Sequence, residues 1–284
     1  MRKKAQKTAI PLPNKLTFNY LRRTPFGRMV GKRKLFFTFA FVILACIISP
    51  TVRYFVVSVV EFPIHYKEYR EFGIRIPSSY DVHGIDVSRW QDRMDWSRVR
   101  AMKVGNIRLT FCFIKASEGG FKKDREFDRN WAAARKNGLI RGAYHYFKPA
   151  HSPTLQSWNF KRCVDLQKGD LPPVLDIEED GGMNRADLLK NAKIWLDNIE
   201  SRYGVRPIIY TNKEFYLKYF YKEPVFANYR LWIAHFRVND LDMPRDVKWH
   251  FWQHNDSGNV NGTNENVDFN VFNGDSAELR KLCL

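Results

Sequence analysis

Eight short apolar runs with the character of β-strands recur between residues 83 and 272, and helix-like stretches separate most of them. This alternation is typical of an α/β fold in which helices connect parallel strands. The strand candidates are residues 83–88, 107–116, 140–147, 173–178, 207–211, 231–236, 248–254 and 267–272. The helical candidates are residues 96–103, 125–136, 154–166, 185–202 and 214–220.

Two architectures fit such a pattern. About 200 residues with eight strands predict an irregular (β/α) barrel with some helices short or missing, although such barrels typically contain about 250 residues. The alternative is a doubly wound sheet, but no glycine-rich phosphate loop follows the first strand candidate. We therefore expect the barrel.

Positive charge is concentrated at the N-terminus of the chain. The 284 residues include 47 Lys and Arg against 30 Asp and Glu, a net charge of +17. Residues 1–60 contain 12 basic residues and no acidic one, so 35 basic and 30 acidic residues remain in the rest of the chain. A basic surface for nucleic acid is therefore not expected on the folded part.

An uncharged apolar run, residues 35–52, directly follows the basic segment. Its 18 residues just suffice to cross a bilayer core, which takes roughly 17 to 25 helical residues. The positive-inside bias then keeps the N-terminus in the cytoplasm. We predict a basic cytoplasmic tail over 1–34, a transmembrane signal anchor over 35–52, a linker over 53–80 and a folded domain over 81–284. That domain would lie outside the cytoplasmic membrane, in the periplasm or the extracellular space.

The cysteines leave two alternatives open. Residues 43–46 (ILAC) resemble a lipobox, so lipidation at Cys46 competes with an uncleaved anchor, although the apolar run continues beyond Cys46. Cys163 and Cys283 could pair if the domain is extracytoplasmic, whereas Cys112 lies in an apolar run and is expected in the core.

Four acidic residues are predicted to meet at the mouth of the barrel. Asp86 ends the first strand, Asp176 and Glu178 end the fourth, and Asp268 lies in the last. Asp176 and Glu178 are two positions apart, so their side chains leave a strand on the same face. Two carboxyls in one pocket cannot ionise independently, so one pKa rises and a proton donor exists at neutral pH. Glycoside hydrolysis requires such a donor beside a second charge-stabilising group.

Six segments, in the same order, resemble glycoside hydrolase family 25 lysozymes, and the resemblance spans residues 81 to about 273. The segments are residues 83–88 (HGIDVS) with Trp90 and Gln91, residues 113–119 (FIKASEG), residues 142–147 (GAYHYF), residues 176–178 (DIE), residues 231–234 (LWIA), and Trp252-Gln253 followed by residues 266–268 (NVD). The resemblance implies an N-acetylmuramidase that cleaves the β-1,4 bond between N-acetylmuramic acid and N-acetylglucosamine in peptidoglycan. It also implies that Glu178 is the acid/base and Asp176 its partner, with Asp86 and Asp268 completing the acidic mouth.

Aromatic residues near strand ends are candidates for binding sugar, because the apolar faces of pyranose rings stack on aromatic planes. Tyr144 and Trp232 have this placement, and the resemblance implies for Tyr144 a hydrogen bond at the reacting sugar. Gln253 and Tyr210, in the strand candidates 248–254 and 207–211, complete the predicted substrate-binding set.

No cofactor or metal is predicted. His250 and His254 share a strand face, but a pair of histidines without a third ligand is more often packing than a metal site. The expected partners are peptidoglycan glycan strands and, through the N-terminal helix, the lipid bilayer; the catalytic domain is expected to be monomeric. A non-catalytic wall-binding or scaffold protein on the same fold is the alternative, and the presence of all four carboxylates favours the enzyme.

The spacing of the carboxylates also bears on mechanism. Asp176 and Glu178, side by side on one strand, cannot easily flank a scissile bond as nucleophile and acid. We therefore expect the 2-acetamido group of the substrate to act as nucleophile, oriented by Asp176, with retention of configuration. Inversion, with Asp86 or Asp268 activating water, is the alternative.

Overall fold

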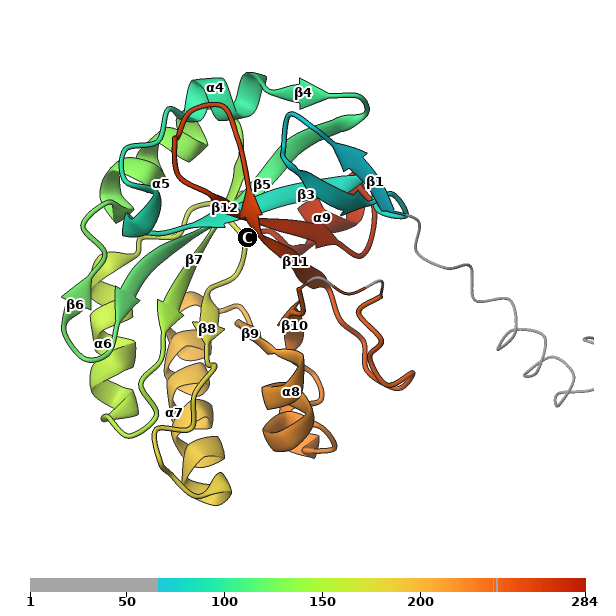
Figure 1. The fold of residues 1–284 in the computed structure, drawn as a ribbon. Helices are drawn as coiled ribbons and strands as arrows, with labels where there is room; N and C mark the ends of the chain where they lie inside the picture. The colour runs from blue at the N-terminus through green and yellow to red at the C-terminus, as the bar shows by residue number, and fades with distance from the viewer. Residues whose placement is uncertain (1–65, 237, 239) are drawn as a thin grey trace, which may run out of the picture. The chain divides into compact units, whose positions relative to one another are not determined.

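The computed structural model describes residues 66–236, 238 and 240–284, and in it all eight predicted strands form and close into a barrel (Figure 1). Around the barrel the order is β3-β12-β11-β10-β9-β8-β7-β5, and β3 also pairs with β5 to close the ring. The bounds are β3 Val82–Val87, β5 Ile107–Glu118, β7 Ile140–Tyr146, β8 Val174–Asp176, β9 Ile208–Asn212, β10 Arg230–Ala234, β11 Phe251–Gly258 and β12 Val267–Phe272. The prediction of a barrel is therefore confirmed.

Helices cover one side of this barrel more fully than the other. Around β5, β7 and β8 the connections are α5 (Phe127–Lys136), α6 (Pro153–Cys163) and α7 (Arg185–Tyr203). The remaining described elements are short: α4 Trp96–Ala101, α8 Lys213–Phe215, α9 Ser276–Leu282, η1 Arg89–Gln91, η2 Tyr216–Phe220, η3 Pro224–Phe226, β4 Lys103–Val104 and β6 Lys122–Lys123. Asn184 caps the start of α7, and Gly204, with φ of 68°, ends it in the left-handed conformation.

Strand direction departs from the predicted all-parallel arrangement. β12 runs antiparallel to both of its neighbours, β11 and β3, whereas the other barrel pairings are parallel. The physical reason is the short connection between β11, which ends at Gly258, and β12, which begins at Val267. A parallel return requires a crossover of a dozen or more residues, usually with a helix, so this segment can only turn back.

A β-hairpin precedes the barrel where the sequence predicts a linker over 53–80. β1 (Tyr66–Tyr69) and β2 (Ile74–Pro77) pair antiparallel, and the folded unit spans residues 63–284. Phe72, in the turn, is fully buried and packs edge-on against Phe269 of β12 with ring centroids 5.2 Å apart. The folded unit therefore begins before the predicted boundary at residue 81, because the apolar residues of the hairpin cover the side of the barrel that lacks long helices.

The barrel interior is packed with aromatic rings. Phe113 stacks on Trp232 with centroids 4.2 Å apart, and Phe111 and Phe251 complete the layer. Gly84 and Gly142 make room for these rings, since a Cβ added at either would lie 2.5 Å from a ring carbon of Phe111 or Phe113. Because this aromatic layer fills the interior, the polar side chains lie above it, at the mouth of the barrel.

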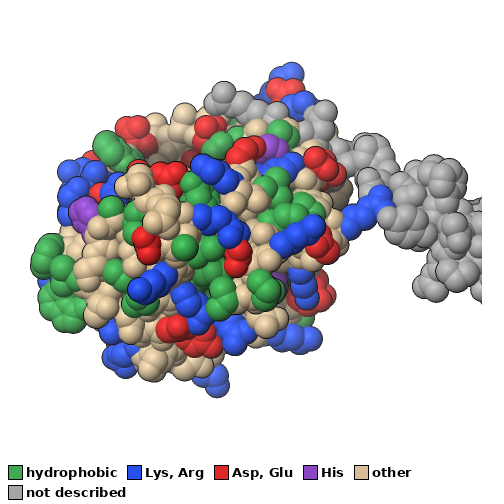
Figure 2. All heavy atoms as spheres, turned by 90° about the horizontal axis from the view of Figure 1, so that it is seen from below, with side chains coloured by type: hydrophobic (Ala, Val, Ile, Leu, Met, Phe, Trp, Pro, Cys, Tyr) green, Lys and Arg blue, Asp and Glu red, His purple; other side chains and the backbone are tan. Residues whose placement is uncertain are grey.

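The predicted cytoplasmic tail 1–34, the anchor 35–52 and Cys46 lie outside the described residues. Within the part of the chain that the structure describes, no helix is both long and apolar enough to span a bilayer. The face seen in Figure 2 carries Lys and Arg side chains interspersed with acidic and apolar ones.

Candidate active site

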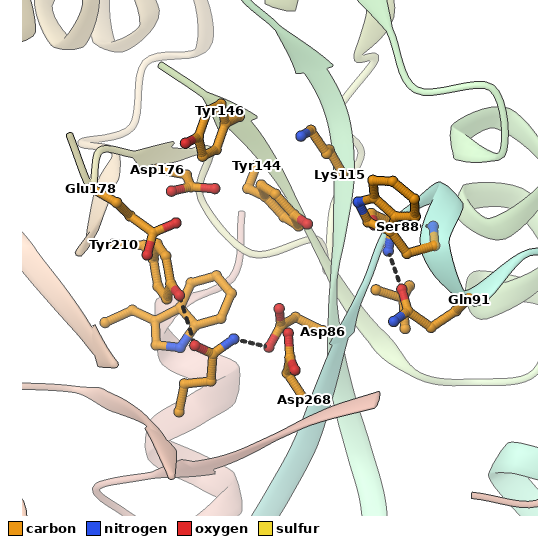
Figure 3. Close-up of a pocket in the computed structure, with 14 residues that line it drawn as sticks. Asp86, Ser88, Gln91, Lys115, Tyr144, Tyr146, Asp176, Glu178, Tyr210 and Asp268 are labelled. Atoms are coloured by element: carbon orange, nitrogen blue, oxygen red, sulfur yellow. Dashed lines mark hydrogen bonds between the residues drawn. The ribbon is translucent and has the colours of Figure 1, made fainter. Parts of the chain in front are cut away.

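A cavity of about 190 Å³ opens where the parallel strands of the barrel end (Figure 3). All eight side chains predicted as site residues line it, although they come from seven different strands or strand ends. They are Asp86, Tyr144, Asp176, Glu178, Tyr210, Trp232, Gln253 and Asp268. The barrel thus brings together residues that are up to 182 positions apart in the sequence.

Asp176 and Glu178 form the first carboxyl pair. Asp176 ends β8, Glu178 follows two residues later, and Ile177 between them donates its N–H to the carbonyl of Tyr210 over 3.0 Å. Burial raises the pKa of both carboxyls, and the charge of Glu178 raises the pKa of Asp176 further. Lys115, which lines the same cavity, acts in the opposite direction on both. Burial and mutual repulsion therefore favour a proton shared by the pair, and the Lys115 cation opposes this effect.

Asp86 and Asp268 form the second pair, on the opposite side of Tyr144 in Figure 3. They are direct partners in the antiparallel register of β3 and β12. Burial raises the pKa of Asp86 well above its ordinary value, and the neighbouring Asp268 adds to this effect. Burial likewise raises the pKa of Asp268 to about 6. The antiparallel direction of β12 matters here, because it brings the beginning of that strand, not its end, to the mouth.

Hydrogen bonds hold Asp86 in place. Its Oδ2 accepts from Nε2 of Gln253 and from Nδ2 of Asn270, each over 2.7 Å. The Tyr210 hydroxyl donates to Oε1 of Gln253 over 2.7 Å, and Nε1 of Trp232 donates to Oδ1 of Asn270 over 2.7 Å. Each amide is thereby fixed with its NH₂ group toward Asp86. The cap of the following turn, η1, is Ser88, so Asp86 is not needed for that purpose.

The predicted substrate-binding residues therefore differ in what they can offer a sugar. Trp232 is only 1% exposed and its ring stacks on Phe113, so it forms part of the cavity wall and not an open stacking surface. The polar groups of Gln253 and Tyr210 bind each other and Asp86. Tyr144 lies between the two carboxyl pairs in Figure 3, where burial and the surrounding carboxylates raise its pKa well above the ordinary value. Its hydroxyl thus stays protonated and can donate to a substrate oxygen.

Three further residues of the site are not among the site residues that the sequence predicts. Lys115 donates from Nζ to Glu118 over 2.9 Å and lies 4.6 Å from the ring centroid of Tyr146. Asn270 positions Asp86, and Trp90, 71% exposed, lines the rim of the cavity. Two of the three follow a readable signal: Lys115 and Asn270 each lie two positions from a residue of the barrel interior, Phe113 and Asp268 respectively, and so share its face.

The remaining histidine and cysteine candidates lie away from this cavity. His254 is buried beside Trp252 and Phe269, and no group of three or more metal-ligand side chains occurs within the described residues. Cys163 and Cys283, whose pairing the sequence leaves open, are free thiols, and Cys112 is buried in the core as expected.

The family model of glycosyl hydrolases family 25 matches residues 85–263. An uncharacterized protein of Escherichia coli K12, YegX, is 46% identical over 235 residues, which are 81% of this chain and 85% of YegX. Lysozyme M1 of Streptomyces globisporus is 35% identical over 213 residues, 71% of each chain. Among solved structures, a bacterial lysozyme from Streptomyces coelicolor is similar with a TM-score of 0.67 and 32% identity, covering 72% of this chain and 98% of that one. A family 25 glycosyl hydrolase from Bacillus anthracis has a TM-score of 0.66 and 28% identity, covering 79% and 99%.

Proposed function

Because the chain belongs to glycosyl hydrolases family 25 and is a glycoside hydrolase of the lysozyme type, we propose that it is an N-acetylmuramidase. Its substrate would be the β-1,4 bond between N-acetylmuramic acid and N-acetylglucosamine in peptidoglycan. Lysozyme M1 and the N,O-diacetylmuramidase of Arthroderma benhamiae, 29% identical over 212 residues, support this substrate class.

The observation that carries the proposal is the first carboxyl pair. Departure of a sugar oxygen requires a proton at a pH where ordinary carboxyls are ionised, and burial raises the pKa of Glu178 in the required direction. Glu178 protonates the departing oxygen and, once ionised, takes a proton from the incoming water. The nearby ammonium group of Lys115 stabilises the pair after the proton has left.

Asp176 has a different task in this scheme. Its Oδ1 is buried and has no hydrogen-bond partner among the described residues, so it can accept from an N–H group of the substrate. The 2-acetamido group supplies such an N–H. Asp176 orients that group as its carbonyl oxygen attacks the anomeric carbon, and Tyr144 donates a hydrogen bond at the reacting sugar. Configuration is retained, because water then displaces the acetamido oxygen from the same face as the first leaving group.

Asp86 and Asp268 supply negative potential and positioning from across the cavity. Oδ2 of Asp86 already accepts two hydrogen bonds, so these bonds hold the Asp86 side chain in one orientation. Inversion would instead require Asp86 or Asp268 to activate a water molecule on the opposite face of the sugar.

Proton NMR of the first product, recorded before mutarotation, tests the mechanism. Retention gives the β anomer at first, whereas an initial α anomer would refute substrate assistance and favour inversion. Zymography on purified peptidoglycan tests the activity itself. Binding to the wall without hydrolysis would favour the scaffold alternative.

We further propose that residues 35–52 anchor the protein in the cytoplasmic membrane and that the barrel lies outside it. A basic tail precedes the apolar run, and no comparable cluster of basic residues directly follows it. This asymmetry supports the orientation. A reporter fused after Leu284 that is active only in the cytoplasm would refute it.

A further inference from the structure

Two large aromatic side chains are exposed outside the catalytic cavity. Phe121, in the turn between β5 and β6, is 69% exposed, and Trp158, on α6, is 49% exposed. Arg162 contacts both residues: its Nη2 donates to the carbonyl of Phe121 over 2.9 Å, and its guanidinium lies 5.1 Å from the ring centroid of Trp158. We call Phe121, Trp158 and Arg162 the aromatic patch. Figure 2 shows apolar side chains gathered at the left edge of the view, the side on which β6 and α6 lie in Figure 1.

Buried hydrogen bonds hold the patch in a fixed geometry. Asn159, fully buried on α6, donates from Nδ2 to the carbonyls of Gly119 and Lys122 over 2.9 and 3.0 Å. Its Oδ1 accepts from Nε of Arg162 over 3.0 Å. The turn that carries Phe121 is thereby fastened to the helix that carries Trp158. The backbone that carries both aromatic residues is therefore already ordered before any ligand binds.

The patch is continuous with the wall of the cavity. Glu118, at the end of β5, accepts from Lys115 over 2.9 Å and from Lys122 over 3.4 Å. Lys115 lines the cavity, and Lys122 follows Phe121 in the chain. One ion-paired group thus connects the catalytic pocket to the patch.

We propose that the aromatic patch is a secondary binding site for the peptidoglycan polymer, outside the catalytic cavity. The inference rests on the proposed function, since it assigns the patch the same substrate. Aromatic planes stack against the apolar faces of pyranose rings, and the charges of Arg162 and Lys122 complement the carboxylates of lactyl groups and stem peptides. The cavity of about 190 Å³ holds only a small part of a long strand, so further contacts outside it increase affinity for polymer over fragments.

Aromatic and basic side chains would also suit a lipid surface. The placement of the patch disfavours binding to a lipid surface. Figure 1 shows β1, where the described chain begins, on the opposite side of the barrel from β6 and α6. The patch and β1 therefore lie on opposite sides of the barrel.

Co-sedimentation with purified peptidoglycan sacculi tests the proposal. The full chain is kept in detergent micelles and carries Glu178→Gln, so that the wall is not consumed. Phe121→Ala with Trp158→Ala should weaken binding to sacculi about tenfold. Val225→Ala is the matched control, because Val225 is also apolar and 51% exposed but lies on η3, and it should bind as the parent does. Circular dichroism establishes that each variant is folded.

Three outcomes would overturn the proposal: unchanged binding of the double variant to sacculi, an equal loss for Val225→Ala, or an equal loss of affinity for a soluble tetrasaccharide fragment. Selective loss of binding to vesicles with anionic lipids, with sacculi binding unchanged, would overturn it in favour of the membrane. Failure of the muramidase proposal is seen separately, as absence of wild-type hydrolysis in the zymogram. Patch-dependent binding to sacculi would remain measurable in that case.

Discussion

The two carboxyl pairs of the cavity are built in different ways by different halves of the barrel. Asp176 and Glu178 come from one strand end, in the half where parallel strands alternate with the helices α5, α6 and α7. Asp86 and Asp268 are partners across the antiparallel strands β3 and β12, in the half that has the hairpin β1–β2 in place of long helices.

This difference suits the first pair to the chemical reaction and the second pair to a supporting role. In the first pair, Oδ1 of Asp176 has no hydrogen-bond partner among the described residues, and the charge beside the pair is a lysine. In the second pair, Asp86 is fixed by two amide donors. The open Oδ1 of Asp176 can accept a hydrogen bond from a substrate, whereas the two amide donors hold Asp86 in a fixed position.

The largest expected effect is at Glu178. Glu178→Gln should lower the rate of hydrolysis by about a hundredfold to ten-thousandfold, because the amide keeps the shape but cannot donate the proton. Turnover of soluble peptidoglycan fragments measures this loss. Glu200→Gln is the matched control, since Glu200 pairs with Arg206 and does not line the cavity. Near-normal turnover of Glu178→Gln would remove Glu178 from its role.

The comparison of the two pairs is sharpened by amide substitutions in each. Asp176→Asn should lose nearly as much activity as Glu178→Gln, because it can no longer stabilise the acetamido group as charge develops there. Asp268→Asn should lower kcat only about tenfold, because we assign Asp268 an electrostatic and positioning role only. Measured kcat values for the two variants decide the matter, and equal losses would contradict the division of labour.

The hairpin is the next feature to test. Phe72→Ala should lower the free energy of unfolding by about 3 kcal/mol, since a buried Phe that packs on Phe269 leaves a cavity when truncated. Urea denaturation of the variant measures the change, with the exposed Phe121→Ala as the control of equal size. A negligible effect at Phe72 would mean that the hairpin is a dispensable addition to the barrel.

The smallest expected effect concerns pH. The folded pKa of Asp268, about 6, exceeds its unfolded value, so its contribution to stability is fully present below about pH 4 and is lost as pH rises through 6. Buried His83 and His254, with pKa values lowered to about 4 and 3, act in the opposite direction over part of this range. Relative to the wild type, Asp268→Asn should therefore gain on the order of 2 kcal/mol of stability between pH 4 and 7. Paired urea titrations at both pH values measure it, and a constant difference would argue against a buried, proton-binding Asp268.

The sequence predicts the position of the first carboxyl pair more directly than that of the second. Spacing of two on a predicted strand is enough to place Asp176 and Glu178 together, because side-chain alternation is a local property. Asp268 was expected at the mouth on the assumption of parallel strands, yet it arrives there through an antiparallel one. The direction of β12 follows from the length of a connection, which periodicity alone does not reveal.

The hairpin and the positioning residues were missed for related reasons. β1 and β2 are four residues each, too short for a sustained period to emerge, and their apolar residues become meaningful only once Phe269 is beside them. Asn270 shares a strand face with Asp268, but this spacing alone does not assign it a role. Its importance comes from two contacts, Trp232 and Asp86, that are 38 and 184 positions away.

The closure of the barrel by β12 has a consequence for the time at which activity can appear. β3, near the beginning of the folded unit, completes its pairing only when residues 267–272 have been synthesised, so its partner is among the last segments to become available. Contacts between such distant parts of a chain form slowly, because a long loop must be closed first. A nascent or C-terminally truncated chain therefore already contains Glu178 but lacks the strand that completes the cavity. We therefore expect a chain that ends before residue 267 to lack hydrolase activity.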